Sequence, residues 1–293
     1  MTTASEWVPN TEDVRLLDEE MAQKGVPVRR RPELAVGHWM RLGKPMPTDF
    51  VVAAKGLRQA FEALHPSVDF SNQPFAVLAA SARSVAYEVN PPIVFGSMPV
   101  SPIQSVKITQ AELQRIHQAD PTAFWELYYQ AADAIDLFHS EMDFHPQEPE
   151  AAKMLSVGFS QLQASARQMI GSSTDGSLEQ AMALAAELVV KAVLREKGVP
   201  LARLQALGHS VPKLVAELAT LLPGPLDAEL AQVAATLPPY VASRYSPSDL
   251  GPAEAQDVYR RALFVCGEAL RRTRHDQLYS KLVADPGVPP RKW

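Results

Sequence analysis

The chain has little cysteine and no marked excess of one charge. Cys266 is its single cysteine, which rules out an intramolecular disulfide and zinc sites built from several cysteines. Twenty-eight Lys and Arg residues stand against 33 Asp and Glu residues, for a formal net charge of −5. A protein that coats nucleic acid by bulk electrostatics is therefore excluded, although a local basic site is not.

Long apolar runs are also missing. The most apolar segment, AMALAAELVVKAVL, is interrupted by Glu187 and Lys191 and is too short to span a bilayer. The acidic N-terminal stretch lacks the apolar core of a signal peptide. These absences predict a cytoplasmic protein that makes no use of a membrane.

Motifs for cofactor or metal chemistry are absent as well. The sequence has no glycine-rich phosphate loop, no serine nucleophile elbow and no paired-carboxylate motif. The segment FHSEMDFHPQE (138–148) holds two histidines and three acids, but no pair has a recognised spacing such as His-Glu-x-x-His. We therefore expect no cofactor and no metal, and we interpret this segment as a solvated helix end.

Helical periodicity, by contrast, runs through most of the chain. Thr109 with Glu112 has capping-box spacing, and Asp120-Pro121 places a cap before a proline at the first helical position. We expect helices at about 149–171, 178–197, 211–222, 227–243 and 252–283. An earlier helix is expected after Asp49. Another is expected over FAVLAASARSVAYEV (75–89), after Asn72 and Pro74. The proline-rich segment 91–108 is expected to be extended.

These patterns predict a mainly α fold in two parts. An N-terminal, mostly helical region (1–145), in which short strands remain open, precedes a helical bundle (149–283). The joint lies at the polar, proline-containing stretch from Phe144 to Pro149. We expect the fragment from about Pro149 to Arg274 to fold alone, because its predicted helices carry complete apolar stripes.

The C-terminal part has a characteristic order of motifs. A helix containing AAELVVKAVL, with Glu187 and Lys191, is followed by a short connection, by GHSVPKLV around Gly208-His209-Ser210, and by a helix ending in YVASRY with Arg244-Tyr245. Over roughly residues 150–275 this order resembles the HEPN domain, a small helical bundle of many prokaryotic nucleotide- and RNA-related systems. The first 140 or so residues resemble no family in this way.

Local chemistry around His209 agrees with a helix start. Gly208 can adopt the left-handed conformation that ends a helical segment, and Ser210 can cap the next helix. Pro212 falls in the first turn, where its missing N–H is not needed. His209 is thereby placed at a helix N-terminus, where the dipole favours a neutral imidazole and attracts anions.

The resemblance implies two alternative roles for His209. Many HEPN proteins are metal-independent ribonucleases in which an arginine and a histidine, with four to six residues between them, share one site, usually across a dimer interface. Arg203 and His209 have five residues between them, but Leu204 replaces the polar residue that commonly follows the arginine. The interpretation we favour is a structural histidine that bridges two helices by hydrogen bonds; the alternative is a general acid or base.

Other charged residues carry similar alternatives. Arg244 is able to hold a phosphate or to pair with an acid such as Glu187, which itself has the i, i+4 spacing of an ion pair with Lys191. One side of the last helix carries Arg260, Arg271 and Arg274, and Arg272 and His275 add charge nearby. This cationic side is either a surface for anions or RNA or a solvated face.

The sequence therefore leaves two functional hypotheses. The first is a non-catalytic HEPN-like binding or dimerisation module, homodimeric, that acts with a nucleotide- or RNA-directed partner. A nucleotidyltransferase-type protein or a toxin–antitoxin or phage-defence partner fits that description, and Arg244, Tyr245, Glu187 and Lys191 are the candidate binding residues. The alternative is a metal-independent ribonuclease with His209 as general acid or base and Arg203 or Arg244 holding the phosphate.

Overall fold

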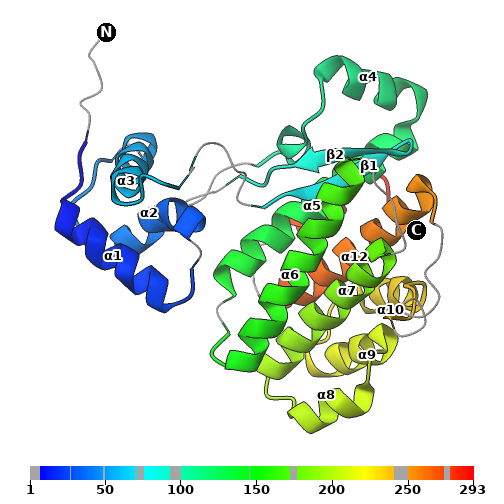
Figure 1. The fold of residues 1–293 in the computed structure, drawn as a ribbon. Coiled ribbons are helices and arrows are strands. Elements are labelled where there is room, and N and C mark those ends of the chain that lie inside the picture. The colour runs from blue at the N-terminus through cyan, green and yellow to red at the C-terminus, as the bar shows by residue number, and fades with distance from the viewer. Residues whose placement is uncertain are drawn as a thin grey trace. The chain divides into compact units, whose positions relative to one another are not determined.

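The computed structural model describes most of the chain: residues 7–26, 28–48, 50–68, 70, 76–92, 100–144, 146–171, 177–240, 250–273 and 278–293. The fold is mainly helical with a few short strands, as predicted. The chain divides into two compact units, Met1–Phe75 and Ala76–Trp293 (Figure 1).

The first unit is built from three helices, α1 (Thr11–Gln23), α2 (Arg31–Arg41) and α3 (Phe50–Leu64), with a 3-10 turn η1 (Val28–Arg30) before α2. Asn10 caps α1 by accepting from the backbone N–H groups of Glu12 and Asp13. The helices bury one side each, through residues such as Leu17, Trp39 and Phe61. Their apolar faces form the core of this unit.

The second unit is centred on four long helices: α5 (Pro121–Asp143), α6 (Pro149–Ile170), α7 (Ser177–Glu196) and α12 (Pro252–Arg271). α12 packs against α5, α6 and α7, and α7 also packs against α6 and α9 (Figure 1). α7 is apolar on most of its surface and therefore needs covering from several sides, which its position between these helices provides.

Shorter helices complete the second unit. α4 (Gln110–Ala119) packs against α5, and so does α13 (Leu278–Ala284), which comes much later in the chain. α8 (Leu201–Leu207), α9 (Val211–Leu221) and α10 (Asp227–Ala235) follow α7. Two predictions need correction here: α8 was not expected, and the helix predicted over 252–283 is interrupted, since α12 ends at Arg271 and α13 begins only at Leu278.

A β-hairpin replaces the helix that was predicted over 75–89. Strands β1 (Leu78–Ala82) and β2 (Val85–Val89) pair antiparallel, joined by Arg83 and Ser84, which have φ angles of 51° and 63°. Positive φ at both central residues is the geometry of a type I′ turn, whose twist suits a hairpin. In the extended region expected at 91–108, the described part forms a 3-10 turn, η2 (Pro102–Ser105), and a bridge from Val106 to Val89.

Side chains from distant helices satisfy the backbone of β1. The N–H of Ser81 donates to the side-chain oxygen of Gln130 on α5 (2.9 Å), and the Gln130 amide donates back to the Ser81 carbonyl (3.0 Å). The N–H of Ala79 donates to the Tyr259 hydroxyl on α12 (3.1 Å). The strand is thus stabilised by groups 49 and 180 residues away, and local propensity is overridden.

The division between the units differs from the one expected near residues 144–149. That stretch connects α5 to α6 inside the second unit, where the middle of α5 is buried against α12 and β1. α5 therefore belongs with the bundle that follows it. Among the described helices, none has the length and apolar character needed to cross a membrane.

Candidate functional site

The turn between α8 and α9 holds the histidine that the sequence singled out. Gly208 has φ 67° and ψ −139°, a positive-φ conformation that side-chain-bearing residues rarely adopt. Ser210 occupies the N-cap position of α9 but makes no capping hydrogen bond through its side chain, and proline stands in the first turn. The chain reversal at Gly208 turns His209 back toward α7.

His209 and Lys191 meet at one buried carboxylate. The Nδ1 atom of His209 lies 3.0 Å from both carboxylate oxygens of Glu187, and the Nζ atom of Lys191 donates to Oε1 at 2.6 Å. The Glu187 side chain is only 2% exposed, whereas that of His209 is 52% exposed. A charge this deeply buried requires such partners, and the contacts join α7 to the α8–α9 turn.

This geometry fixes which ring nitrogen of His209 carries a proton. An ionised carboxylate can only accept hydrogen bonds, so Nδ1 is the donor. In the neutral imidazole, Nε2 is then an acceptor with its lone pair free to take a proton. The half-exposed ring therefore has one nitrogen tied to the core and the other available for a ligand or for proton transfer.

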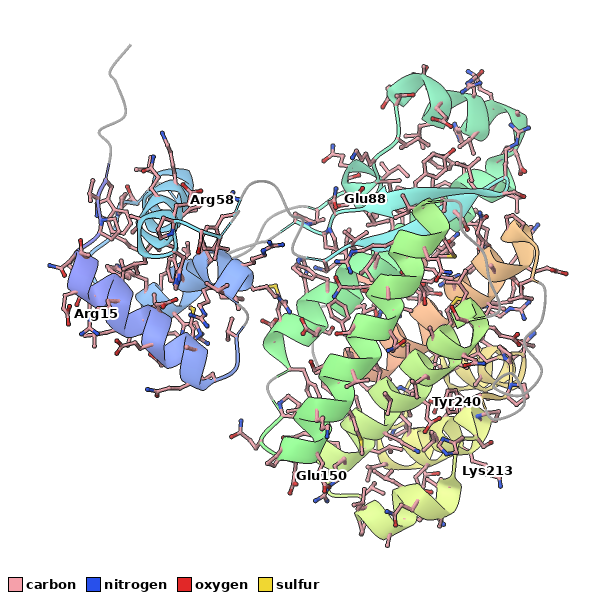
Figure 2. The ribbon with its side chains drawn as sticks, in the orientation of Figure 1. Arg15, Arg58, Glu88, Glu150, Lys213 and Tyr240 are labelled. Carbon is pink, nitrogen blue, oxygen red and sulfur yellow. The ribbon has the colours of Figure 1, made fainter. Side chains whose placement is uncertain are left out.

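An aromatic side chain covers part of this histidine. The rings of His209 and Tyr240 have their centroids 5.5 Å apart and are tilted by 42°. Tyr240 follows α10, and Figure 2 shows it on the same side of the second unit as Lys213 of α9. The neighbouring imidazole and phenol rings supply stacking and hydrogen-bonding groups for a polar ligand.

Arg203 is engaged elsewhere. Its Nε and Nη2 atoms donate to the two carboxylate oxygens of Glu217 on α9, at 3.3 and 2.7 Å. The bidentate contact with Arg203 lowers the pKa of Glu217. No contact between Arg203 and His209 occurs in the described part of the chain, so the arginine–histidine pair suggested by the sequence is not brought together through direct interaction within one copy.

Two of the candidate binding residues, Arg244 and Tyr245, lie outside the described residues. Arg274 and His275, which were expected to add charge to the last helix, lie outside them as well. The partners seen for Glu187 are Lys191 and His209. The expected i, i+4 ion pair of Glu187 with Lys191 is present.

The cationic side expected on α12 is not a solvated face at Arg271, which is 1% exposed. Its guanidinium binds Asp133 and, at 2.9 Å, Asp136, both on α5. Glu268 completes the group at 3.5 Å, and burial raises the pKa of its carboxyl. Arg271 is therefore a structural ion in the core, and the anion-surface interpretation does not hold for it.

The segment from Pro289 to Trp293 covers the same region. The Tyr129 hydroxyl donates to the Pro289 carbonyl (2.7 Å), and Arg291 donates to Asp133 (2.6 Å) while its guanidinium lies 4.0 Å from the centroid of the Trp293 ring. Sequence inspection missed this buried charge cluster. The available signal was the pair Asp133 and Asp136, three residues apart in the otherwise apolar stretch AADAIDLF, because buried carboxylates need cationic partners.

Comparisons with protein-family models, curated proteins and solved structures give no match to the chain. The resemblance to the HEPN domain continues to rest on the motifs quoted for it. Within the described ranges, no three His, Cys, Asp or Glu side chains are grouped so that they could hold a metal ion.

Proposed function

We propose that the second unit is a HEPN-like module that acts without catalysis of its own, binding or dimerising together with a nucleotide- or RNA-directed partner. The observation that carries this proposal is the Glu187 carboxylate, whose oxygens are occupied by Lys191 and by Nδ1 of His209. Such a network ties the α8–α9 turn to the centre of the bundle. It gives His209 a structural task, and the engagement of Arg203 by Glu217 agrees with it.

The surface around the exposed half of His209 is the proposed contact area. The His209 side chain is 52% exposed, and the ring of Tyr240 lies with its centroid 5.5 Å from that of the imidazole. A fixed imidazole and an aromatic ring favour stacked bases and phosphate groups over apolar partners. In the setting of a toxin–antitoxin or phage-defence system, this surface would meet a nucleotidyltransferase-type partner or its RNA.

Two measurements on the full chain test this proposal. Sedimentation equilibrium at micromolar concentration should show a homodimer, and fluorescence anisotropy with a labelled single-stranded RNA should show binding that weakens in Tyr240→Ala. The matched control is Val157→Ala, an exposed apolar position on α6. A strict monomer with RNA affinity equal in all three proteins contradicts the proposal.

A second candidate function is a metal-independent ribonuclease, favoured by one observation. Glu187 holds Nδ1 of His209 as a donor, and the His209 side chain is 52% exposed, an arrangement that suits a general base for a ribose 2′-hydroxyl. The products would carry 2′,3′-cyclic phosphate ends, and EDTA would not inhibit. The phosphate would be held by Arg244, or by Arg203 of a second copy.

The two candidates differ in what His209→Ala does. For the ribonuclease, the substitution abolishes cleavage and leaves the affinity for RNA nearly unchanged; for the binding module, the wild type itself cleaves nothing. His117→Ala, another exposed histidine in the same unit, is the matched control. Absence of cleavage by the wild type under all conditions tried sinks the enzyme hypothesis.

A further inference from the structure

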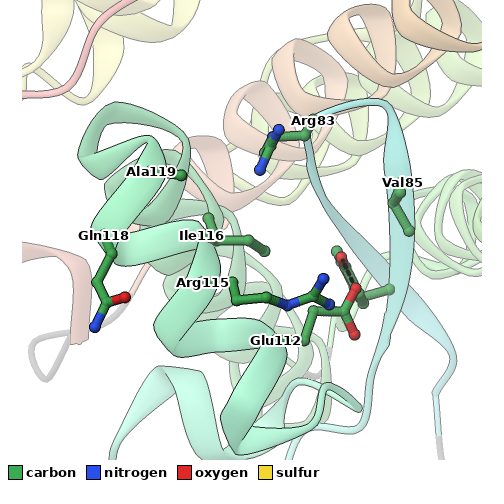
Figure 3. A pocket seen from close by; sticks show the side chains of 8 residues that line it. Arg83, Val85, Glu112, Arg115, Ile116, Gln118 and Ala119 are labelled. Carbon is green, nitrogen blue, oxygen red and sulfur yellow. Dashed lines mark hydrogen bonds between the residues drawn. The ribbon is translucent and has the colours of Figure 1, made fainter.

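A cleft opens between the β-hairpin and α4, formed by none of the residues of the His209 network. It has a volume of about 540 Å³ and is lined by Arg83, Val85, Tyr87, Glu112, Arg115 and Ile116, with Gln118 and Ala119 at its edge. A volume of this size is typical of sites for small molecules. Figure 3 shows Arg83 reaching from the hairpin turn toward α4, and Arg115 reaching from α4 toward the strands.

Arg83 and Arg115 are the two cationic residues that line this cleft. In the part of the chain that the structure describes, neither Arg83 nor Arg115 makes a hydrogen bond or ion pair with another residue. This distinguishes them from Arg203, Arg260 and Arg271, which all engage carboxylates. Two guanidinium groups that enter one cleft from different elements form a clamp for a ligand with two negative charges.

The position of Arg83 results from the turn itself. Arg83 has φ 51° and Ser84 has φ 63°, a conformation in which glycine or asparagine is the usual choice. An arginine in this place has a steric cost, and no hydrogen bond or ion pair with a described residue offsets it. Strained residues are concentrated at functional sites, and a role of the guanidinium in binding a ligand accounts for this cost.

The floor of the cleft carries a second kind of recognition group. The Tyr87 hydroxyl donates to Oε1 of Glu112 at 2.8 Å, which leaves the other Glu112 oxygen to accept from a ligand. Burial and this contact with Glu112 raise the pKa of Tyr87 to about 12, whereas the charges of Arg115 and Arg83 act in the opposite direction. Both guanidiniums therefore lie within electrostatic reach of the same hydroxyl.

Glu112 is directed into the cleft by its place in α4. Its backbone N–H donates to the Thr109 hydroxyl, the expected first half of a capping box, but its carboxylate turns to Tyr87 on β2. Val85, 47% exposed, and buried Ile116 add apolar surface on the two sides. The cleft thus combines a doubly cationic rim, one carboxylate acceptor and apolar walls.

We propose that this cleft binds a small organic phosphate. Its phosphate lies between Arg83 and Arg115, a hydroxyl or amino group donates to Glu112, and its carbon skeleton contacts Val85 and Ile116. A phosphate monoester carries nearly two negative charges at neutral pH, which matches the two arginines better than a single carboxylate does. The donor requirement follows from Glu112, because Tyr87 occupies Oε1 only and a ligand without a donor leaves the other oxygen without one.

Isothermal titration calorimetry of the full chain tests this with three probes: adenosine 5′-monophosphate, adenosine and inorganic phosphate. We expect the monophosphate to bind at least about tenfold more tightly than either other probe. Arg83→Gln and Arg115→Gln should each weaken its binding by about tenfold or more, as expected for loss of a charge-assisted hydrogen bond. Lys153→Gln, which removes an exposed charge from α6, should leave it unchanged.

Glu112→Ala separates the two halves of the site. It should weaken binding of the monophosphate but leave inorganic phosphate unchanged or more tightly bound, because a nearby negative charge is removed. Circular dichroism melts of the arginine variants should match the wild type, since both side chains are exposed and without described partners. The proposal is overturned if neither phosphate probe binds at millimolar concentration, if the double arginine variant binds like the wild type, or if the adenosine part adds no affinity.

Discussion

Arg271 on α12 binds Asp136 on α5 at 2.9 Å, across 135 positions of the sequence. The same carboxylate accepts from the backbone N–H groups of Leu278 and Tyr279 at the start of α13, at 2.8 and 2.9 Å. One buried aspartate thus links three helices of the second unit. Because Arg271 and Asp133 beside it are both buried, removal of Asp136 unbalances the charges of a cluster that water does not reach.

Substitution of this aspartate should therefore strongly destabilise the second unit. We expect Asp136→Ala to lower the free energy of unfolding by about 3–5 kcal/mol, the cost typical of breaking a buried ion pair from one side. Urea denaturation followed by circular dichroism measures the change. Asp257→Ala, which removes a partially exposed carboxylate from α12, is the control with little effect. Equal midpoints for the two variants would show that the buried pair contributes nothing.

The same contacts determine which fragment folds. The fragment from about Pro149 to Arg274 omits α5, and with it Asp133, Asp136 and the glutamine that satisfies β1. We now expect that fragment to lose a cooperative thermal transition, whereas residues 76–293 should keep it because they contain every element of the second unit. Differential scanning calorimetry of both fragments is the test. A cooperative transition of equal enthalpy per residue in the shorter one would restore the boundary suggested by sequence.

Local signals in the sequence located most helices. α6 and α9 begin where expected, at Pro149 and Val211, and α7 begins within one residue of its expected start. The side chains of Thr109 and Asp120 accept from backbone N–H groups as predicted. These features depend on neighbours within one helical turn, so the sequence alone contains the information for them.

The hairpin and the buried ions could not be found in that way. Residues 75–89 follow helix-capping residues and are rich in alanine, and the turn at Arg83-Ser84 lacks the glycine or asparagine that signals a hairpin. The strand is held by Gln130 and Tyr259, which approach it only in the folded state. Likewise, no local pattern shows that the Arg271 side chain is only 1% exposed, because its partners Asp133 and Asp136 come from α5.

The sequence identified most residues of the candidate site, but it did not predict all of the contacts between them. The sequence paired Glu187 with Lys191 and offered His209 as a bridge between helices. The structure places all three together. Arg203 was grouped with His209 from spacing alone, but its partner is Glu217 on the next helix, a contact that depends on the unpredicted helix α8.

The His209 network should contribute measurably to stability. His209→Ala removes a hydrogen bond to a buried carboxylate, so we expect a loss of about 1 kcal/mol or somewhat more. Glu187→Ala should cost more, because Lys191 and His209 both lose their acceptor. Thermal melts of these variants and of the control His117→Ala would rank the effects. If His209→Ala melts like His117→Ala, the histidine is not a bridge that stabilises the fold.

Alkaline pH should destabilise the second unit through its tyrosines. Burial raises the pKa of Tyr87 to about 12, and burial also raises the pKa values of Tyr259 and Tyr279. Unfolded tyrosine ionises near pH ~10, so above that pH the folded chain retains protons that the unfolded chain has lost. The contribution is fully present below about pH 10 and is lost as the pH rises through the folded-state values.

Urea midpoints measured as the pH is raised should therefore fall, and the phenolate absorbance should appear together with unfolding. Tyr87→Phe should reduce the steepness of this fall, because one retained proton is removed from the folded state. Its stability at neutral pH should change by about 1 kcal/mol, the contribution of one hydrogen bond. A phenolate signal that is complete before the protein unfolds would contradict the assignment.

The segment Pro289–Trp293, which covers the buried charge cluster, is synthesised long after the α5 residues that it contacts. Asp133 finds Arg271 only 138 residues later and Arg291 only 158 residues later, and Tyr129 bonds Pro289 160 residues away. During synthesis, α5 leaves the ribosome well before any of these partners exists. Contacts of such large sequence separation form late and slowly, so we expect the two carboxylates of α5 to stay hydrated on the nascent chain until α12 and Pro289–Trp293 arrive. The core of the bundle is therefore completed only after Pro289–Trp293 has been synthesised, although α5 is made much earlier.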